Sequence, residues 1–444
     1  MTLKDKALIL IGKLAIFIIN FFQLGSASTW PGNIALFFNN NFIRNIVLKN
    51  PKIKINLVTG TNGKTTTTSL IVYILKENNY KVLNNSEGAN LLNGIASSLI
   101  KHCKLNGLLD FNNAVFEVDE NSFHLMLEQV NPYSIIILNL FRDQLDRYGE
   151  TDIIFNKWLQ GLKKIDSKCN IYLNGDDPQI YYLGQKIKAK ITYFGLTNKF
   201  FIKKNIEHDV DSIYCPVCKS KLIYKGITYS HLGDYYCKCG FKRMKVENLE
   251  IDEKKYKIQG IFSLYNITAL YLLLNNLYSI SQQNINKYLT QFEPVFGRQE
   301  QIKFLDRYFY IFLSKNPVGL NQSINLSLKK FNLKKENIWF ILNDRIPDGK
   351  DISWIWDADI EKLNNNYKRI FVSGDRLYDM AIRLKYAGCS INLCSNNLYK
   401  SLKIIMKKLK INEKIIVFPT YTSMLELRKI LKGKKFEWKK QICL

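Results

Sequence analysis

Val58-Thr-Gly-Thr-Asn-Gly-Lys-Thr-Thr-Thr-Thr68 lies between an apolar run at residues 53–58 and a helical pattern at residues 69–76. A strand, a glycine-rich turn and a helix in this order form the context of a phosphate loop. Glycines let backbone N–H groups close around phosphate oxygens, and the helix N-terminus adds a favourable dipole. Threonine is a poor helix former, so propensity does not explain the run of threonines. The pattern therefore predicts a nucleotide site, and the alternative is a plain turn with a surface lysine.

Each part of this loop has an expected role. Lys64 would reach the β- and γ-phosphates, and the Thr65 hydroxyl would coordinate Mg²⁺. The loop departs from the general phosphate-loop pattern at Val58, where the first glycine is expected. The predicted nucleotide-binding residues are Gly60, Thr61, Asn62, Gly63, Lys64, Thr65 and Thr66.

The composition indicates a folded and strongly basic chain. Apolar residues make up 47% of the 444 positions, which argues for a globular protein, and the length suits two or three domains. Lys and Arg number 64 against 38 Asp and Glu, a net charge of +26. This excess attracts anionic partners such as nucleotides, nucleic acid or a membrane surface, although a base-composition bias explains it equally well. The basic residues form no dense block, so charge alone does not indicate nucleic-acid binding.

The N-terminal segment, residues 1–50, is predicted to be helical. Its apolar run from Ala7 to Phe22 resembles a signal peptide, but Lys13 interrupts the run. The run is also short for a spanning helix, which needs about 20 apolar residues. It predicts either a helix packed on the core or one that rests on a membrane surface. Nine cysteines without a regular framework fit a reducing compartment.

Two stretches of alternating strand and helix patterns predict two α/β domains, at residues 51–293 and 294–444. Alternation of this kind indicates a mostly parallel sheet with helices on both faces. Residues from about 207 to 245 interrupt the first domain and carry four cysteines. The second domain is predicted to be Rossmann-like. Polar residues follow its strands and predict a second active-site wall, although any one of them could instead cap a helix.

An acidic strand end, Phe116-Glu-Val-Asp-Glu120, follows in the first domain. Carboxylates at the C-terminal edge of a parallel sheet face the crevice where ligands bind. Because Mg²⁺ prefers one or two carboxylates plus phosphate oxygens, Glu117 is the predicted magnesium ligand beside Thr65. The alternative is a solvated acidic strand end.

The insert contains a predicted zinc site. Cys215 and Cys218 precede Cys237 and Cys239 by about 20 residues, a spacing that fits a structural tetrahedral Zn²⁺ in a hairpin without a core of its own. The second pair is one residue closer than the usual C-x-x-C, which leaves unligated or redox-active thiols as the alternative. His231 is interpreted as a hairpin residue rather than a ligand.

Several motifs together resemble the Mur ligases, which join amino acids to cell-wall precursors. The short segment ahead of the loop would replace the N-terminal UDP-binding domain of those enzymes. The cysteine insert and the segment Asp348-Gly-Lys-Asp-Ile-Ser-Trp-Ile-Trp-Asp357 resemble the MurT branch, the synthetase subunit of lipid II isoglutaminyl synthase. The shared Mur ligase motifs are Thr59–Thr67, Asn174-Gly-Asp-Asp-Pro178, Tyr265-Asn266 and Phe296-Gly-Arg-Gln-Glu300.

The resemblance covers essentially the whole chain and implies a fold, a reaction and a partner. The implied fold is a Mur ligase-like P-loop ATPase domain with a four-cysteine zinc-ribbon insert, followed by a MurT-type domain. In MurT-like proteins ATP phosphorylates the α-carboxylate of D-glutamate in the lipid II stem peptide, and ammonia from a GatD-type glutaminase displaces the phosphate. The implied cofactors are ATP, Mg²⁺ and structural Zn²⁺. The implied location is the cytoplasm, at the inner face of the membrane, with no nucleic-acid partner.

The resemblance also implies roles for single residues. Lys64 and Thr65 match the family's phosphate and metal positions, and Glu117 its acidic metal ligand. Asn266 matches an asparagine near the adenine, and Arg298 an arginine at the domain junction.

The family's C-terminal domain contributes an aspartate that completes the Cys–His pair of the partner glutaminase. That role is placed at Asp351, with Asp357 second, because Asp351 lies in the loop and Asp357 suits a helix cap. Other Mur ligases have a histidine in the segment matching residues 143–146, and this sequence has none there.

Two other functions stay open. A Mur-type or folate-type ligase would add an amino acid rather than ammonia, but the short N-terminal segment and the cysteine insert count against it. A basic ATPase with a zinc ribbon could bind nucleic acid, but no stripe of aromatic and basic residues supports that function.

Overall fold

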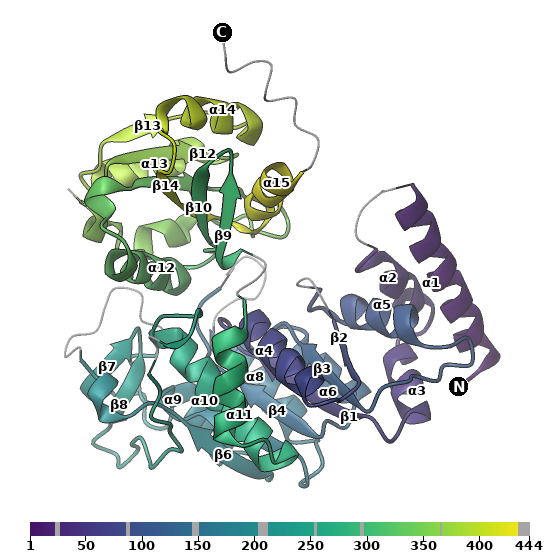
Figure 1. Ribbon diagram of the computed structural model, residues 1–444. Coiled ribbons are helices and arrows are strands. Elements are labelled where there is room, and N and C mark those ends of the chain that lie inside the picture. Colours follow the sequence, from purple (N-terminus) through teal and green to yellow (C-terminus); the bar gives the residue numbers. More distant parts are fainter. Residues whose placement is uncertain are drawn as a thin grey trace. The chain divides into compact units, whose positions relative to one another are not determined.

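The computed structural model of the chain describes residues 1–22, 27–85, 89–143, 151–202, 212–252, 255–293, 297–364 and 366–433. These residues divide into two compact units, each built on its own sheet (Figure 1). The first holds the described residues of Met1–Phe141, Glu150–Ile206 and Val210–Phe292, and the second those of Arg142–Gly149, Glu207–Asp209 and Glu293–Leu444. The predicted start of the insert at residue 207, Pro294 at the predicted domain boundary, Phe296 and residues 144–146 lie outside the described residues.

The sheet of the first unit is parallel throughout, with the order β2-β3-β1-β4-β5-β6. Its strands are β1 (Lys54–Thr59), β2 (Val82–Asn84), β3 (Asn113–Glu117), β4 (Ser134–Ile137), β5 (Asn170–Asn174) and β6 (Lys190–Phe194). The chain first adds β2 and β3 on one side of β1 and then β4 to β6 on the other. In such open sheets the ligand crevice lies outside the carboxyl ends of the strands at this change of direction.

Helices follow the strands of the first unit, as the predicted alternation requires. They are α4 (Lys64–Glu77), α5 (Leu92–His102), α6 (Phe123–Gln129), α8 (Thr151–Leu162), α9 (Pro178–Gln185), α10 (Ile261–Tyr278) and α11 (Gln282–Gln291). Helix α4 begins earlier than the pattern at residues 69–76 predicts, because the glycine turn ends at Gly63 and the threonines form its first turns.

The N-terminal segment forms the helices α1 (Leu3–Phe21), α2 (Trp30–Phe38) and α3 (Phe42–Lys49). All three pack on the first unit, with α5 as a shared neighbour (Figure 1). None of the described helices combines the length and the apolar character that crossing a bilayer requires.

The cysteine insert forms the small antiparallel hairpin β7 (Ile223–Tyr229) and β8 (Leu232–Tyr236). Its core is a separate cluster that includes Cys215, Tyr235 and Phe241, and Tyr181 of α9 packs into it. The hairpin is therefore attached to the sheet of the first unit through α9, the helix that follows β5.

The sheet of the second unit has the order β13-β12-β11-β14-β10-β9, and only its edge pair β9–β10 is antiparallel. Its strands are β9 (Arg298–Phe304), β10 (Arg307–Phe312), β11 (Asn337–Ile341), β12 (Arg369–Ser373), β13 (Ile391–Leu393) and β14 (Lys414–Pro419). Its helices are α12 (Pro317–Lys330), α13 (Leu377–Tyr386), α14 (Leu398–Lys408) and α15 (Tyr421–Lys432), with the 3₁₀ turns η3 (Leu333–Lys335), η4 (Ser353–Asp357) and η5 (Ile360–Leu363).

Strand β11 shows why both faces of this sheet are covered. Ile338 and Phe340 belong to one buried cluster, whereas Trp339 and Ile341 belong to another. Alternate side chains of a strand point to opposite faces, so a strand with four consecutive apolar residues needs cover on both sides. The predicted α/β fold class is confirmed. The sequence did not reveal β2, which is short, or β9, an edge strand with a mixed pattern.

Candidate functional site

The turn between β1 and α4 has the geometry of a phosphate loop. Gly60 and Gly63 have φ angles of +127° and +93°, a region that favours glycine. Asn139, just after β4, fixes the turn from the side: its Oδ1 accepts the Asn62 N–H at 2.8 Å, and its amide donates to the Asn62 carbonyl at 2.9 Å. In the described structure no side chain caps the start of α4. The helix N-terminus can therefore offer its N–H groups to an anion.

Lys64 lies buried over this loop. Its Nζ donates to the carbonyl oxygens of Gly60 at 2.7 Å and Thr61 at 3.2 Å, and it lies 2.8 Å from Oε2 of Glu120. Three acceptors therefore hold the ammonium group beside the loop. Glu120 belongs to the acidic segment Phe116–Glu120, but the sequence assigns it no role. It lies three positions beyond Glu117 and after the end of β3.

Glu117 is the last residue of β3 and is buried. It pairs in register with Val58 of β1, the strand that leads into the loop. Asn85 fixes its backbone through two hydrogen bonds of 2.7 and 2.9 Å, and the Asn90 amide donates to its Oε1 at 3.2 Å. The structure thus brings the predicted magnesium ligand to the strand next to the loop. Neither asparagine carried a sequence signal, since each lies in a connection without a motif.

Asn266 of α10 lies directly against the last glycine of the loop. A Cβ added at Gly63 would come within 2.4 Å of its Oδ1. Its Nδ2 is buried and has no hydrogen-bond partner among the described residues. A buried donor without a partner is costly unless a ligand satisfies it. The uncapped start of α4, the Glu117 carboxylate and the Asn266 amide together fit a nucleotide with Mg²⁺. Asn266 lies beside Gly63, the last glycine of the loop.

Three other predicted residues, Arg298, Asp351 and Asp357, belong to the second unit. Arg298 begins β9 opposite Phe312 and is half-buried. Asp351 lies in the loop before η4, where its carboxylate accepts the Ser353 N–H at 2.8 Å. Asp357 is the last residue of η4. Asp351 therefore lies in a loop, as expected, whereas Asp357 lies inside η4 and is not the residue that precedes a helix.

Asp348, which precedes this segment, has a structural role. Its Oδ1 accepts the Thr422 N–H at 2.8 Å at the start of α15, and its Oδ2 accepts the Thr422 hydroxyl. Burial raises the pKa of the Asp348 carboxyl.

The four predicted zinc ligands converge. Their Sγ atoms all lie within 4.8 Å of one another, with Cys215 and Cys239 at 3.7 Å and Cys218 and Cys237 at 3.4 Å. A Zn–S bond of about 2.3 Å in a tetrahedron gives an S···S distance of about 3.8 Å, so the donor set fits Zn²⁺. A hydrogen bond from the backbone of Ser220 lowers the pKa of Cys218 to about 6, which favours the thiolate that a metal binds.

His231 lies at the turn of the hairpin and is fully buried. Its Nε2 lies 3.3 Å from Oδ2 of Asp177, and its ring packs on Phe141 with centroids 4.8 Å apart. Asp177 caps α9. His231 is therefore a hairpin residue that joins the ribbon to the nucleotide domain.

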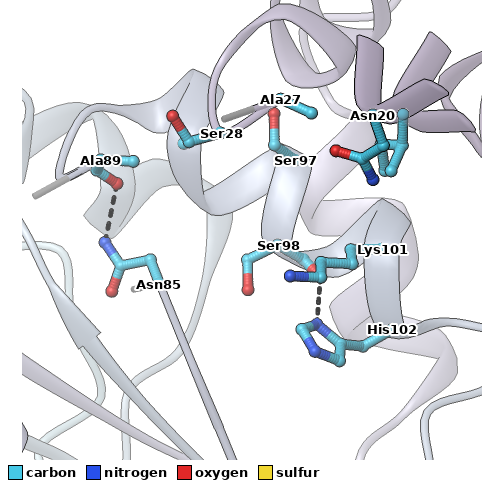
Figure 2. Close-up of a pocket in the computed structure, with 11 residues that line it drawn as sticks. Asn20, Ala27, Ser28, Asn85, Ala89, Ser97, Ser98, Lys101 and His102 are labelled. Carbon is cyan, nitrogen blue, oxygen red and sulfur yellow. Dashed lines mark hydrogen bonds between the residues drawn. The ribbon is translucent and has the colours of Figure 1, made fainter. Parts of the chain in front are cut away.

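A cavity of about 260 Å³ lies between α1, α5 and the segment after β2 (Figure 2). Asn85, which fixes Glu117, lines it and donates to the Ala89 carbonyl at 2.9 Å. The other lining residues are Ile16, Asn20, Ala27, Ser28, Ala89, Gly94, Ser97, Ser98, Lys101 and His102. These residues come from separate elements, so no sequence motif predicts the cavity.

Comparisons with known proteins agree with this geometry. The Mur ligase middle domain family matches residues 58–270, and the MurT ligase C-terminal family matches residues 313–424. A pseudomurein peptide ligase type C from Methanothermus fervidus has a similar structure, with a TM-score of 0.62 and 22% identity over 89% of this chain and 85% of that one. At that identity the likeness shows the fold alone.

Two curated relatives match more of the sequence. Both are named lipid II isoglutaminyl synthase (glutamine-hydrolyzing) subunit MurT. The protein from Streptococcus pneumoniae is 34% identical over 98% of both chains, and that from Staphylococcus aureus is 34% identical over 89% of this chain and 90% of its own. Identity at this level, along the phosphate-loop domain and the C-terminal domain alike, shows that the chain belongs to the MurT family of Mur ligase-like enzymes.

Proposed function

We propose that the chain is the synthetase subunit of a lipid II isoglutaminyl synthase. It would amidate the α-carboxylate of D-glutamate in the lipid II stem peptide to D-isoglutamine during peptidoglycan synthesis. The observation that carries the proposal is the uncapped phosphate loop with Glu117 and Asn266 against it, in a chain that matches MurT relatives nearly end to end. A phosphate loop can bind the ATP that activates a carboxylate, and the names of the relatives indicate lipid II as the molecule that carries this carboxylate.

A carboxylate needs such activation because it is a poor electrophile. ATP with Mg²⁺ supplies the phosphoryl group. The loop N–H groups and Lys64 would hold the phosphates, while Thr65 and Glu117 would hold the metal. Lys64 offsets the negative charge that shifts toward the leaving ADP. The D-glutamate oxygen bonds to the γ-phosphorus and ADP leaves, which gives an acyl phosphate. Ammonia then attacks the carbonyl carbon, inorganic phosphate leaves with the original oxygen, and the nitrogen loses a proton.

Other residues would serve this reaction less directly. Asn266 would donate its Nδ2 hydrogens to the bound nucleotide, which is supported by the lack of a partner among the described residues. Arg298 would contact the nucleotide from the second unit, and this role rests on the family resemblance. The four cysteines would hold Zn²⁺ in a structural role.

The proposed ammonia source is a GatD-type glutaminase that forms a heterodimer with this chain. Asp351 would orient the histidine of that glutaminase, as the acid of a triad does. Asp357 is the second candidate. The proposed location is the cytoplasm, peripheral to the inner face of the membrane, where a lipid-linked acceptor is reached.

The test incubates the purified chain with Mg·ATP and lipid II, and supplies either ammonium or glutamine with the glutaminase. Mass spectrometry follows the change from carboxyl to amide in the stem peptide. Amide formed with either nitrogen source supports the proposal. If no amide forms but ATP is consumed when an amino acid is offered, the chain is instead an amino-acid ligase.

The partner assignment has its own comparison. Asp351→Asn and Asp357→Asn are assayed side by side with both nitrogen sources. The variant that loses the glutamine-driven reaction and keeps the ammonium-driven one identifies the aspartate. If both variants keep both reactions, neither aspartate serves the glutaminase.

A further inference from the structure

Helix α1 lies at the edge of its unit (Figure 1) and carries a stripe of exposed apolar side chains. The stripe residues, spaced alternately by four and three positions, are Leu3, Ala7, Leu10, Leu14, Phe17 and Phe21, and all are exposed. The exposed fractions of Leu3, Phe17 and Phe21 are 85%, 65% and 69%. Residues at this spacing share one face of a helix. A continuous exposed stripe of this size marks an interaction site rather than scattered surface residues.

The opposite side of α1 is already packed. Leu8, Ile9 and Gly12 are buried, and a Cβ at Gly12 would come within 2.8 Å of Ile100 on α5. At the start of the helix, Asp5 is buried and accepts hydrogen bonds from Asn39 at 2.7 Å and from Asn45 at 3.1 and 3.2 Å. The helix is therefore fixed in this orientation, and the stripe is not a misplaced core face.

Charge distinguishes the occupants that the stripe could accept. Residues 1–52 contain six basic residues and one acidic residue, and the acidic one is the buried Asp5. Lys4, Lys6 and Lys13 of α1 are exposed or half-buried beside the stripe. The neighbouring helix α2 adds exposed aromatic side chains, Trp30, Phe37 and Phe38. An apolar helix face with lysines at its edges and aromatic residues nearby is typical of a helix that lies in a membrane interface.

A second helix is the main rival, because the same spacing also forms a coiled-coil seam. In such seams charges of both signs flank the apolar positions and pair across the interface. Here the flanks of α1 carry only lysines, so two copies of this face would repel each other. An anionic bilayer attracts them.

We propose that the stripe of α1 docks on the surface of an anionic lipid bilayer, with its lysines at the phosphate level. Helix α1 would lie along the interface and would not cross it. Ile16 and Asn20 of the same helix line the cavity that borders Asn85. Docking would therefore bring this cavity close to a lipid-linked acceptor, together with Glu117, whose backbone Asn85 binds. The link to the acceptor rests on the proposed function, whereas docking on the bilayer does not depend on any reaction.

The experiment measures binding of the full chain to vesicles by co-sedimentation, without ATP, ammonia or stem peptide. One set of vesicles is phosphatidylcholine and the other also contains phosphatidylglycerol. We expect binding to the anionic vesicles that weakens as salt is added. Leu14→Glu with Phe17→Glu should lower the partition coefficient by at least roughly tenfold. The matched control is Ile411→Glu, an exposed apolar position in the second unit, which should leave binding unchanged.

A second variant separates charge from apolar contact without touching the packed side of α1. Lys4→Glu with Lys6→Glu should weaken binding to the anionic vesicles by roughly tenfold and leave any binding to neutral vesicles unchanged. ATP binding by each variant shows that the first unit is folded.

Absence of vesicle binding by the unmodified chain overturns the proposal. Self-association that Leu14→Glu with Phe17→Glu abolishes would then assign the stripe to a second copy, and a monomer would assign it to another protein. Because amidation is not measured, failure of the proposed reaction and failure of docking are told apart.

Discussion

The two sheets of the chain are both mostly parallel, yet the turns that follow their first parallel strands, β1 and β10, use different chemistry. Between β1 and α4 the turn contains two glycines with positive φ, and no described side chain caps the helix. Between β10 and α12, Asn316 caps the helix by accepting the Gly319 N–H at 2.7 Å, and Pro317 removes one N–H altogether. The first helix end can bind an anion, whereas the second is satisfied by its own residues.

The difference teaches that topology supplies a ligand crevice but turn chemistry decides whether it binds phosphate. The second unit continues the same pattern. Asn397 caps α14, and Asp348 satisfies the start of α15. In the first unit Asp177 caps α9 in the same way. The uncapped start of α4 is therefore a property of its own turn and not of the whole unit. Variants that alter one turn at a time test this contrast.

The largest effect is expected at Lys64. Lys64→Ala removes the charge that we propose faces the phosphates and should lower ATP-dependent amidation by about 10³-fold. It also leaves the buried Glu120 without its ion pair, so Lys64→Ala with Glu120→Gln restores a foldable site for the same assay. The control Lys303→Ala, a surface lysine of β9, should keep full activity. Equal losses in Lys64→Ala and Lys303→Ala would contradict the contrast between the sheets.

Loss of zinc should affect only the first unit. Cys237→Ser should abolish zinc binding, measured by metal analysis, and expose β7 and β8 to hydrogen exchange. The effect should extend to the turn after β5, because the Gly233 N–H donates to the Asp176 carbonyl at 3.0 Å. Cys394→Ser, in the second unit, should keep both zinc and protection. Protection lost equally in the second unit would show that the ribbon is not a local element.

Two glycines with the same backbone angle give a matched comparison of smaller size. Gly63 and Gly240 both have φ of +93°, but a Cβ at Gly63 meets Asn266 whereas nothing lies within 4 Å of one at Gly240. Each change to alanine should cost about 1–2 kcal/mol of stability from backbone strain. Only Gly63→Ala should also weaken ATP binding, by roughly tenfold or about 1.4 kcal/mol. Calorimetry that finds ATP affinity unchanged in Gly63→Ala would remove the loop from the proposed site.

The smallest effect concerns acid stability of the second sheet. Burial acts to raise the pKa of Glu300, but hydrogen bonds from Lys432, the Gly297 N–H and Arg428 outweigh it and lower the pKa. The carboxylate therefore stabilises the folded chain above its unfolded pKa of about 4.3, and that stability is lost as the pH falls through the lower folded value.

Urea unfolding between neutral and acid pH measures this term. Glu300→Gln should lower stability at neutral pH and flatten its acid dependence. Glu77→Gln, an exposed position on α4, should change neither. An unchanged acid dependence in Glu300→Gln would show that these contacts do not stabilise the second sheet.

Much of the architecture could be predicted because it is encoded in local patterns. The α/β class, the phosphate loop and the family follow from alternating apolar runs and from motifs of fixed spacing. The convergence of the cysteines also has a local signal. Strand β9 had no such local signal in the sequence, because an edge strand buries only one face and carries polar residues between its apolar ones.

The support of the site could not be predicted, because it depends on residues far apart in the sequence. Glu117 is fixed by Asn85 and Asn90, and Gly63 is covered by Asn266. Likewise, only the structure showed that Asp357 lies inside η4 and does not precede a helix.

The sequence by itself determined which backbone can turn at Gly60 and Gly63, which side chains are able to bind phosphate or metal, and that the N-terminal run is apolar. Only the tertiary structure decided which faces of these elements are already used. The α1 stripe is exposed because Asp5 and Gly12 fix the helix by its other side, and α4 stays uncapped because its neighbours bond to the turn instead. Propensity and charge act within a few residues, whereas burial depends on what packs from elsewhere in the chain.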